Sequence, residues 1–310
     1  MGLCGSSPKV AKPSSPTSSG GLIINTTPSL ASRLNKRADV LRRILSFHEM
    51  KNPKHYYDIR SFSKLFHRAL PQPPPLFASF PNSNHATLQS LVNRLEELQG
   101  EEETSGNVPS VLFIEAGVYV TAHSSSRRGE IRRGGYVTVN IPLSIYGAGR
   151  EKTTLAGVGL KIEGNKSDGI VEIEELTIKT RTGLFACNGM NVIMRGCSVV
   201  VSMRHGVSAY KADISCDDLQ VVGCGMSGVC ANNNATITLS GQGTSIQGNV
   251  TKGSSNSYGL HAYESSYESL SNFSSSNSKI HLVHPLTKEQ ISTYNGGGGN
   301  WSGNIKQVSK

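Results

Sequence analysis

Long apolar runs and paired cysteines are missing from this sequence of 310 residues. No stretch reaches the roughly 18 apolar residues that a membrane-spanning helix needs, and the apolar cluster at residues 22–24 is too short for a signal peptide. The six cysteines form neither a CxxC pair nor a Cys/His zinc pattern, so no metal or other cofactor is expected, and the five cysteines at residues 187–230 are predicted to be reduced core residues. These absences favour an intracellular, cytoplasmic protein that does not span a membrane.

Charge is distributed unevenly along the chain. The net charge is +9, and residues 28–70 carry ten Lys and Arg residues against three acidic ones, whereas residues 151–310 carry thirteen basic and twelve acidic residues. A basic segment can contact nucleic acid, anionic lipid or an acidic protein, but such a run is more often a solvated face. We therefore predict no nucleic-acid partner.

The first residues match a lipidation pattern. Residues 1–6 read MGLCGS, which fits N-myristoylation of Gly2, with Cys4 available for a palmitoyl chain. Two acyl chains hold a protein on a membrane, whereas one barely does, so the pattern predicts a membrane surface as a partner through acylation. A chance match is one alternative. An organelle-targeting peptide is another, because no acidic residue precedes Asp39 and Ser and Thr are frequent there.

Five segments follow one another along the chain. Residues 1–27, rich in Ser, Pro, Gly and Lys, predict a disordered arm, and the three- and four-residue apolar spacing of residues 28–70 predicts two or three short helices. Residues 71–107 hold a proline-rich linker and an amphipathic helix at about residues 84–99. Strands are expected over residues 108–295. Residues 296–310 form a C-terminal tail, in which residues 305–308 add a last strand or cover an open end.

A repeat headed by glycine decides the fold class. Five segments align on a glycine, with spacings of 24, 23, 22 and 31 residues. In each, the first and third residues after the glycine are apolar and, by the geometry of a strand, point inward, while the second and fourth point towards solvent. The glycine itself is expected to permit a turn conformation. The five are Gly159, Gly183, Gly206, Gly228 and Gly259.

Further apolar pairs later in each repeat indicate three strands per turn of the chain, which is typical of a parallel β-helix. The 31-residue repeat needs an inserted loop, and residues 248–258 are rich in Gly, Ser and Asn. We therefore predict an all-β solenoid, a single-stranded right-handed parallel β-helix with a small N-terminal α-helical region. Leucine-rich repeats have a similar length but require a periodic Leu and Asn that this sequence lacks.

Several stretches resemble the pectate-lyase-like family of right-handed β-helices. Residues 113–119, FIEAGVY, are similar to that family's first strand, and residues 143–149, LSIYGAG, followed by TLAG at residues 154–157, look like its first full turn. The helix near residues 84–99 stands where the family has its N-terminal cap. The resemblance covers about residues 84–295 and implies the fold better than the chemistry.

A second resemblance concerns the basic segment. Residues 40–47, VLRRILSF, and residues 59–66, IRSFSKLF, look like a degenerate F-box. That family joins such helices to a ubiquitin-ligase adaptor, and some members carry β-helical repeats behind them. The sequence departs from the pattern, because the Leu-Pro opening is missing and His48 occupies an apolar position. The alternative is that these helices only cover the end of the solenoid.

Stacked repeats turn each outward position into a column of side chains from successive turns. Aromatic and hydrogen-bonding groups alternate along two such columns and suit a sugar or an extended peptide. Arg181 and Arg204, just before two of the glycines, form a stacked pair that can hold carboxylates or phosphates. The candidate binding residues are Lys161, Arg181, Phe185, Arg204, His205, Tyr210, Asn232, His261 and Tyr263. The two columns also contain Glu163, Cys187, Ser208 and Cys230.

The sequence favours a non-enzymatic recognition or scaffold protein that binds a protein or carbohydrate along this flank, with a ubiquitin-ligase substrate receptor as one form. A carbohydrate-active enzyme of lyase or hydrolase type, acting on an acidic polysaccharide, is the alternative. Such enzymes need clustered carboxylates for calcium or a carboxylate pair. Asp213, Asp217 and Asp218 lie in one repeat without acidic partners at matching places in the next, so no catalytic residue is assigned.

The F-box-like segment can be tested by pull-down from a cell extract. We expect the full chain to capture a ubiquitin-ligase adaptor and Leu45→Asp to lose most of it, because the substitution puts a charge on the apolar face of the first predicted helix. The captured adaptor is quantified by immunoblot. Equal capture by both proteins would exclude an F-box function.

Overall fold

The computed structural model describes residues 77–101, 108–120, 135–157, 159–263 and 277–309, all within one compact unit, Met50–Lys310. The predicted arm at residues 1–27, with Gly2 and Cys4, and the F-box-like helices at residues 28–70 lie outside these residues. In the part of the chain that is described, no helix is both long and apolar enough to cross a membrane.

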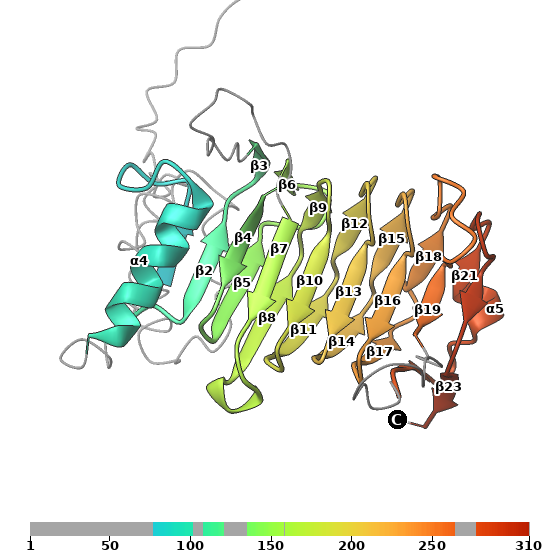
Figure 1. Ribbon diagram of the computed structural model, residues 1–310. Coiled ribbons are helices and arrows are strands. Elements are labelled where there is room, and N and C mark those ends of the chain that lie inside the picture. The colour runs from blue at the N-terminus through green and yellow to red at the C-terminus, as the bar shows by residue number, and fades with distance from the viewer. Residues whose placement is uncertain (1–76, 102–107, 121–134, 158, 264–276, 310) are drawn as a thin grey trace, which may run out of the picture. The chain divides into compact units, whose positions relative to one another are not determined.

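Three parallel sheets, which we call A, B and C, are built by strands that visit them in turn (Figure 1). Sheet A consists of β1 (Phe77–Phe80), β2 (Val111–Ile114), β5 (Leu143–Gly147), β8 (Ile170–Glu174), β11 (Asn191–Arg195), β14 (Asp213–Asp217), β17 (Thr236–Ser240), β20 (Lys279–Val283) and β23 (Ile305–Val308). Sheet B consists of β3 (Gly117–Val120), β6 (Thr153–Ala156), β9 (Thr177–Lys179), β12 (Ser198–Val200), β15 (Gln220–Val222), β18 (Ser245–Gln247) and β21 (Ser292–Thr293). Sheet C consists of β4 (Tyr136–Val139), β7 (Gly159–Glu163), β10 (Leu184–Cys187), β13 (Val207–Tyr210), β16 (Val229–Asn232), β19 (Leu260–Ala262) and β22 (Trp301–Ser302).

From β2 onward, each strand pairs in parallel with the strands three places before and after it, so one turn of the chain adds one strand to every sheet. This arrangement confirms the predicted parallel β-helix. Two strands lie outside the segment expected from the sequence: β1 precedes residue 108, and β22 lies in the stretch predicted as a tail, where it pairs with β19. The last strand that the sequence offered at residues 305–308 is present as β23, which pairs with β20.

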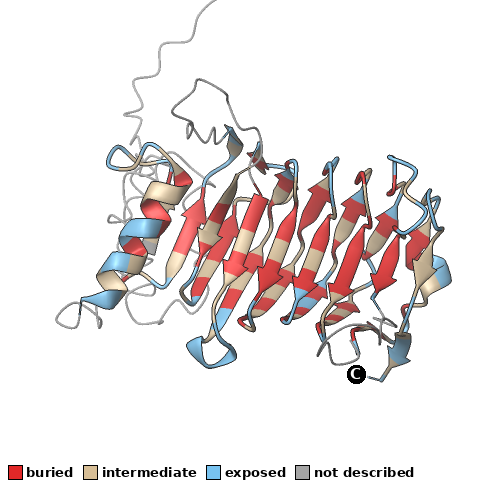
Figure 2. Cartoon of the chain, in the orientation of Figure 1, coloured by how far each residue is buried: buried red, intermediate tan, exposed pale blue. Residues whose placement is uncertain are grey.

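The interior is filled by the apolar residues that the repeat placed inward. After each glycine of sheet C, the first column contains Leu160, Leu184, Val207, Val229 and Leu260, and the second contains Ile162, Ala186, Ala209, Ala231 and Ala262. All ten residues are buried, and Figure 2 shows burial concentrated along the strands and exposure at the turns. Burying a Val, Leu or Ile side chain contributes roughly 1.5–3 kcal/mol and an alanine less, so the stacked columns supply much of the stability.

The amphipathic helix is α4 (Leu88–Gly100), and it covers the first edge of sheet C. Its buried face consists of Leu88, Leu91, Val92 and Leu95. The Gln89 amide pairs with the backbone of Thr138 as a neighbouring strand would: Oε1 accepts from the Thr138 N–H at 2.7 Å, and Nε2 donates to the Thr138 carbonyl at 3.2 Å. The helix thus protects an edge that could otherwise pair with another chain. Two short helices, η2 (Lys166–Asp168) and α5 (Lys288–Ile291), lie in connections.

Glycine is required at the five repeat positions for a different physical reason from the one expected. None of the five glycines adopts a positive φ, so a turn conformation is not what requires them. Instead, each lies at the corner between sheets B and C, where a side chain has no room. A Cβ on Gly183 would lie 1.9 Å from the Gly206 carbonyl oxygen, and a Cβ on Gly206 would lie 2.4 Å from Cγ1 of Val221.

A matched pair of glycine substitutions tests this steric explanation. We expect Gly206→Ala to lower the free energy of unfolding by about 1–3 kcal/mol, as overpacking of a core does. Gly100→Ala at the exposed end of α4, where a Cβ would meet no atom within 4 Å, should leave it nearly unchanged. Urea midpoints measured by circular dichroism make the comparison, and similar midpoints for both variants would argue against a space constraint.

Candidate functional site

The two predicted columns run along the outer face of sheet C in the expected register. In the first, Lys161, Phe185, Ser208, Cys230 and His261 are partners on successive strands. In the second, Glu163, Cys187, Tyr210 and Asn232 are partners, and Tyr263 follows β19, with its backbone N–H donating to the Ala231 carbonyl at 2.8 Å. Adjacent strands of a sheet lie about 4.8 Å apart, so these columns present side chains at that interval.

Exposure along this face differs from the expectation that all outward residues meet solvent. Tyr210 and Tyr263 are 38% and 43% exposed, but Cys230 and His261 are only 5% and 8% exposed. The reason is aromatic packing: the His261 ring contacts Tyr258 and Tyr263, each with ring centroids 4.9 Å apart. Tyr258 comes from the inserted loop of the 31-residue repeat, so this loop covers His261 at the C-terminal end of the first column.

Burial decides the protonation of the two histidines and the thiol in this region. Desolvation lowers the pKa of His205 to about 4, with a further contribution from His261, and desolvation also lowers the pKa of His261. Among the described residues, no group hydrogen-bonds to the buried Nδ1 of His205. Burial raises the pKa of Cys230 to about 12. Cys230 is therefore a protonated thiol at neutral pH and is unsuited to act as a nucleophile beside His261.

At the N-terminal end of the same face, on β7, two outward side chains form an ion pair. Lys161 Nζ forms an ion pair with the Glu163 carboxylate, and this hydrogen bond raises the pKa of Lys161. Asn188 Nδ2 donates to Glu163 Oε1 at 2.9 Å, and the ring of Phe185 lies 6.3 Å from that of Tyr136. Lys161 thus already has an acidic partner, whereas Phe185 provides a half-buried apolar surface next to it.

Arg181 and Arg204 come together at the corner between sheets B and C. The Arg204 N–H donates to the Arg181 carbonyl at 3.0 Å, and both residues are exposed. Ser202 anchors the backbone beneath them, because its Oγ donates to the carbonyls of Arg181 and His205, at 3.1 and 3.0 Å. The structure therefore brings the predicted arginine pair and His205 into one cluster, at the edge of the aromatic face rather than on it.

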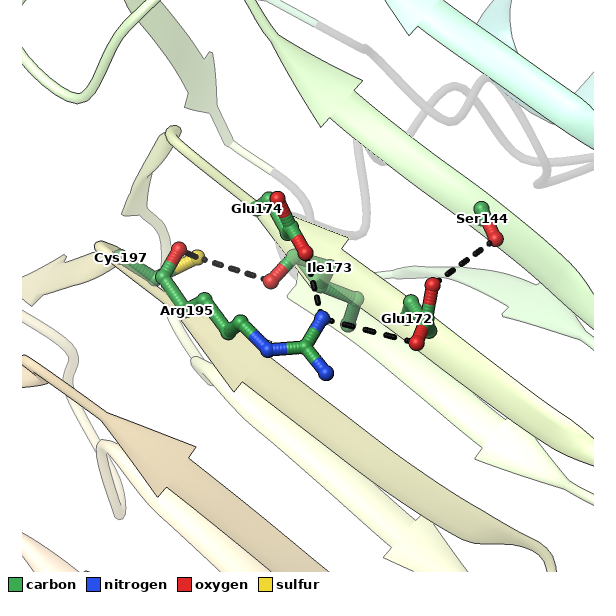
Figure 3. Close-up of polar contacts among 6 residues, drawn as sticks. All are labelled: Ser144, Glu172, Ile173, Glu174, Arg195 and Cys197. Carbon is green, nitrogen blue, oxygen red and sulfur yellow. Dashed lines mark hydrogen bonds and ion pairs between the residues drawn. The ribbon is translucent and has the colours of Figure 1, made fainter. Parts of the chain in front are cut away.

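A charged cluster on the outer face of sheet A was missed in the sequence (Figure 3). Arg195 on β11 forms ion pairs with Glu174 and Glu172 on β8, the latter at 3.5 Å, and Ser144 Oγ on β5 donates to Glu172 at 3.3 Å. Burial lowers the pKa of Arg195, but the hydrogen bond and charge of Glu174 outweigh it, so the pKa is raised. The next partner of Arg195 along the sheet is Asp217.

A signal for this cluster was present in the sequence. Glu174, Arg195 and Asp217 follow one another at intervals of 21 and 22 residues, and each comes directly after an inward residue of its strand. Aligning the repeats on this strand, as well as on the glycines, would have placed an arginine between two carboxylates. The ion pairs neutralise much of the charge, which suits a stabilising role for Arg195.

In the described part of the chain, no group of three or more His, Cys, Asp and Glu side chains is placed to hold a metal ion. The five described cysteines are free and buried. Comparisons of the chain with protein-family models, with curated proteins and with solved structures found no match.

The half-buried His205, whose Nδ1 atom is fully buried, makes stability depend on pH. Its pKa is about 4 in the folded chain, against 6.5 for an ordinary histidine, so the unfolded chain binds more protons between these values. The stability that neutral His205 contributes above pH 6.5 should be lost as the pH falls from 6.5 through about 4, by on the order of 2–3 kcal/mol. Urea unfolding at pH 7.5 and pH 4.5 measures this loss, and His205→Gln should show a smaller one. An equal loss in the variant would assign the effect to other groups.

Proposed function

We propose that this protein is a non-enzymatic recognition protein that binds an extended carbohydrate or peptide along the outer face of sheet C. The single observation that carries the proposal is the register of the second column. It places Tyr210, Asn232 and Tyr263 next to one another on successive turns. Two exposed aromatic rings therefore flank a side-chain amide.

The chemistry of this trio suits a repeating ligand. An aromatic ring offers a flat apolar face with a polar tip, and an amide both donates and accepts hydrogen bonds. Phe185 continues the apolar surface along the first column, with the Lys161–Glu163 pair beside it. A linear polymer that runs along the solenoid axis meets Tyr210, Asn232 and Tyr263 in succession, which favours an extended ligand over a compact one.

Two finer assignments belong to the same proposal. We propose that the β-helix is related to the pectate-lyase-like family, on the residues that resemble its first strand and first turn. We also propose that residues 28–70, if they act as an F-box, join the ligand of the solenoid to a ubiquitin ligase. The acylation pattern at Gly2 and Cys4 would then place the protein at the cytoplasmic side of a membrane.

An enzyme acting on an acidic polysaccharide is the second candidate, and the sheet A cluster is the observation in its favour. There, Arg195 lies in register between the carboxylates of Glu174 and Asp217. A hydrolase needs one carboxyl group that stays protonated and one that is free to act as a base or nucleophile. Glu174 is instead ion-paired with Arg195, so we rank recognition above catalysis.

Affinity electrophoresis in gels that contain a soluble polysaccharide tests the recognition proposal. We expect a β-glucan or polygalacturonate gel to retard the protein, and Tyr210→Ala and Tyr263→Ala to weaken the interaction by about 1–2 kcal/mol each, or roughly five- to thirty-fold. Tyr294→Ala is the matched control, because Tyr294 is 88% exposed and lies on a turn after sheet B. Immobilised extended peptides provide the parallel assay.

Three outcomes would count against the proposal. One is that Tyr294→Ala weakens retardation as much as the two sheet C variants do. Another is that neither polysaccharides nor peptides bind. The third is that the protein releases unsaturated or reducing ends from polygalacturonate and that Arg195→Ala abolishes this release, which would favour the enzyme.

A further inference from the structure

The corner between sheets B and C carries charge of one sign. The turns at this corner, together with the last residues of sheet B, hold four exposed basic side chains: Lys179, Arg181, Arg204 and Lys252. Residues 176–212 and 219–263 contain no Asp or Glu. Among the described residues, the acidic side chains of the neighbouring turns lie instead on sheet A and at its corners, as with Glu174, Glu175 and Asp217, or at the far end of a sheet C strand, as with Glu163. We call the basic corner the B–C edge.

Backbone contacts between successive turns place Arg181 and Arg204 in one row and Lys252 in the row beside it. The Arg204 N–H donates to the Arg181 carbonyl, the Met226 N–H to the Arg204 carbonyl and the Val250 N–H to the Met226 carbonyl. The Lys252 N–H donates to the Gly225 carbonyl at 3.3 Å. Because Gly225 has no side chain, the lysine can lie across it: a Cβ there would be 3.0 Å from Lys252 Cε and 2.4 Å from the Met203 carbonyl oxygen.

Exposed aliphatic side chains lie among the charges on the same edge. Val201 is 61% exposed, Met203 54% and Val222 41%. Val201 lies beside Gly223 of the next turn, where an added Cβ would be 3.9 Å from Cγ2 of Val201. Large aliphatic side chains on a protruding turn do not contribute to the core, and next to several cations they form a mixed apolar and basic surface.

Val201 is held in a costly backbone conformation. Its φ is 53°, in the left-handed region that β-branched residues rarely adopt. The equivalent positions on the next two turns are Gly223 and Gly248, for which a positive φ costs little. An exposed valine that strains the backbone, at a position where the next two turns have glycine, indicates that the side chain is used for something other than folding.

We infer that the B–C edge docks on the surface of an anionic phospholipid membrane. The four cations meet lipid phosphates and carboxylates, and Val201, Met203 and Val222 enter the boundary between headgroups and acyl chains. A soluble polyanion would use the cations but has no place for the aliphatic residues, which is why a membrane fits this surface better. The inference concerns a different surface from the sheet C columns and does not depend on the proposed function.

Vesicle sedimentation tests the inference, with all proteins carrying Gly2→Ala so that N-terminal acylation does not contribute. We expect the protein to bind vesicles of phosphatidylcholine with phosphatidylserine, and to bind pure phosphatidylcholine vesicles much more weakly. The double variant Arg204→Glu/Lys252→Glu should bind these vesicles at least roughly ten-fold more weakly than the parent. The matched control is Lys152→Glu/Lys306→Glu, which changes the net charge equally at exposed lysines away from the edge.

Val201→Gly separates docking from folding. Replacing the strained valine by glycine should raise the urea midpoint, because the backbone conformation then costs less, and should weaken vesicle binding at the same time. A residue with only a structural role would not move the two measurements in opposite directions. The inference is overturned if both double variants lose binding equally, if Val201→Gly binds vesicles as the parent does, or if the protein binds soluble polygalacturonate through this edge but not vesicles.

Discussion

In-register stacking of turns is the constraint on which the rest of this structure depends. The described strands pair with the equivalent strands of the neighbouring turns, so a shift of one residue would reverse every side chain on a strand. The interior columns, of which Leu184 and Ala186 are examples, are therefore apolar in every turn. The corner glycines follow from the same requirement, because the chain passes so close to the next turn at Gly183 and Gly206 that a side chain cannot be accommodated.

The sequence was sufficient to predict five of the seven strands of sheet C, from β7 to β19. Glycine followed by alternating apolar residues specifies both the inward direction and the register, and the columns from Lys161 to His261 follow directly. Two features were not accessible in this way. The covering of His261 depends on Tyr258, whose position is set by the inserted loop and not by the repeat. The space around each glycine depends on a neighbouring turn more than twenty residues away, which a local propensity cannot express.

Charge is sorted around the solenoid by the same stacking. On sheet A, acidic residues from one turn meet Arg195 from the next, which offsets their repulsion. At the corner of sheets B and C, basic residues of successive turns lie side by side without acidic residues in the adjoining segments. Like charges on neighbouring turns repel one another, whereas opposite charges in register attract. The first arrangement thus serves the fold, and the second is the one from which we infer docking on an anionic surface.

The inserted loop at residues 248–258 shows where the architecture tolerates change. The repeat that contains it is 31 residues long instead of 22–24, yet β18 and β19 keep their registers with the turns on both sides. Extra chain at a corner thus leaves the interior untouched. During evolution, such a protein can gain or lose loops one corner at a time and diversify its surface, while residue-by-residue similarity to its ancestors fades and the stack itself persists.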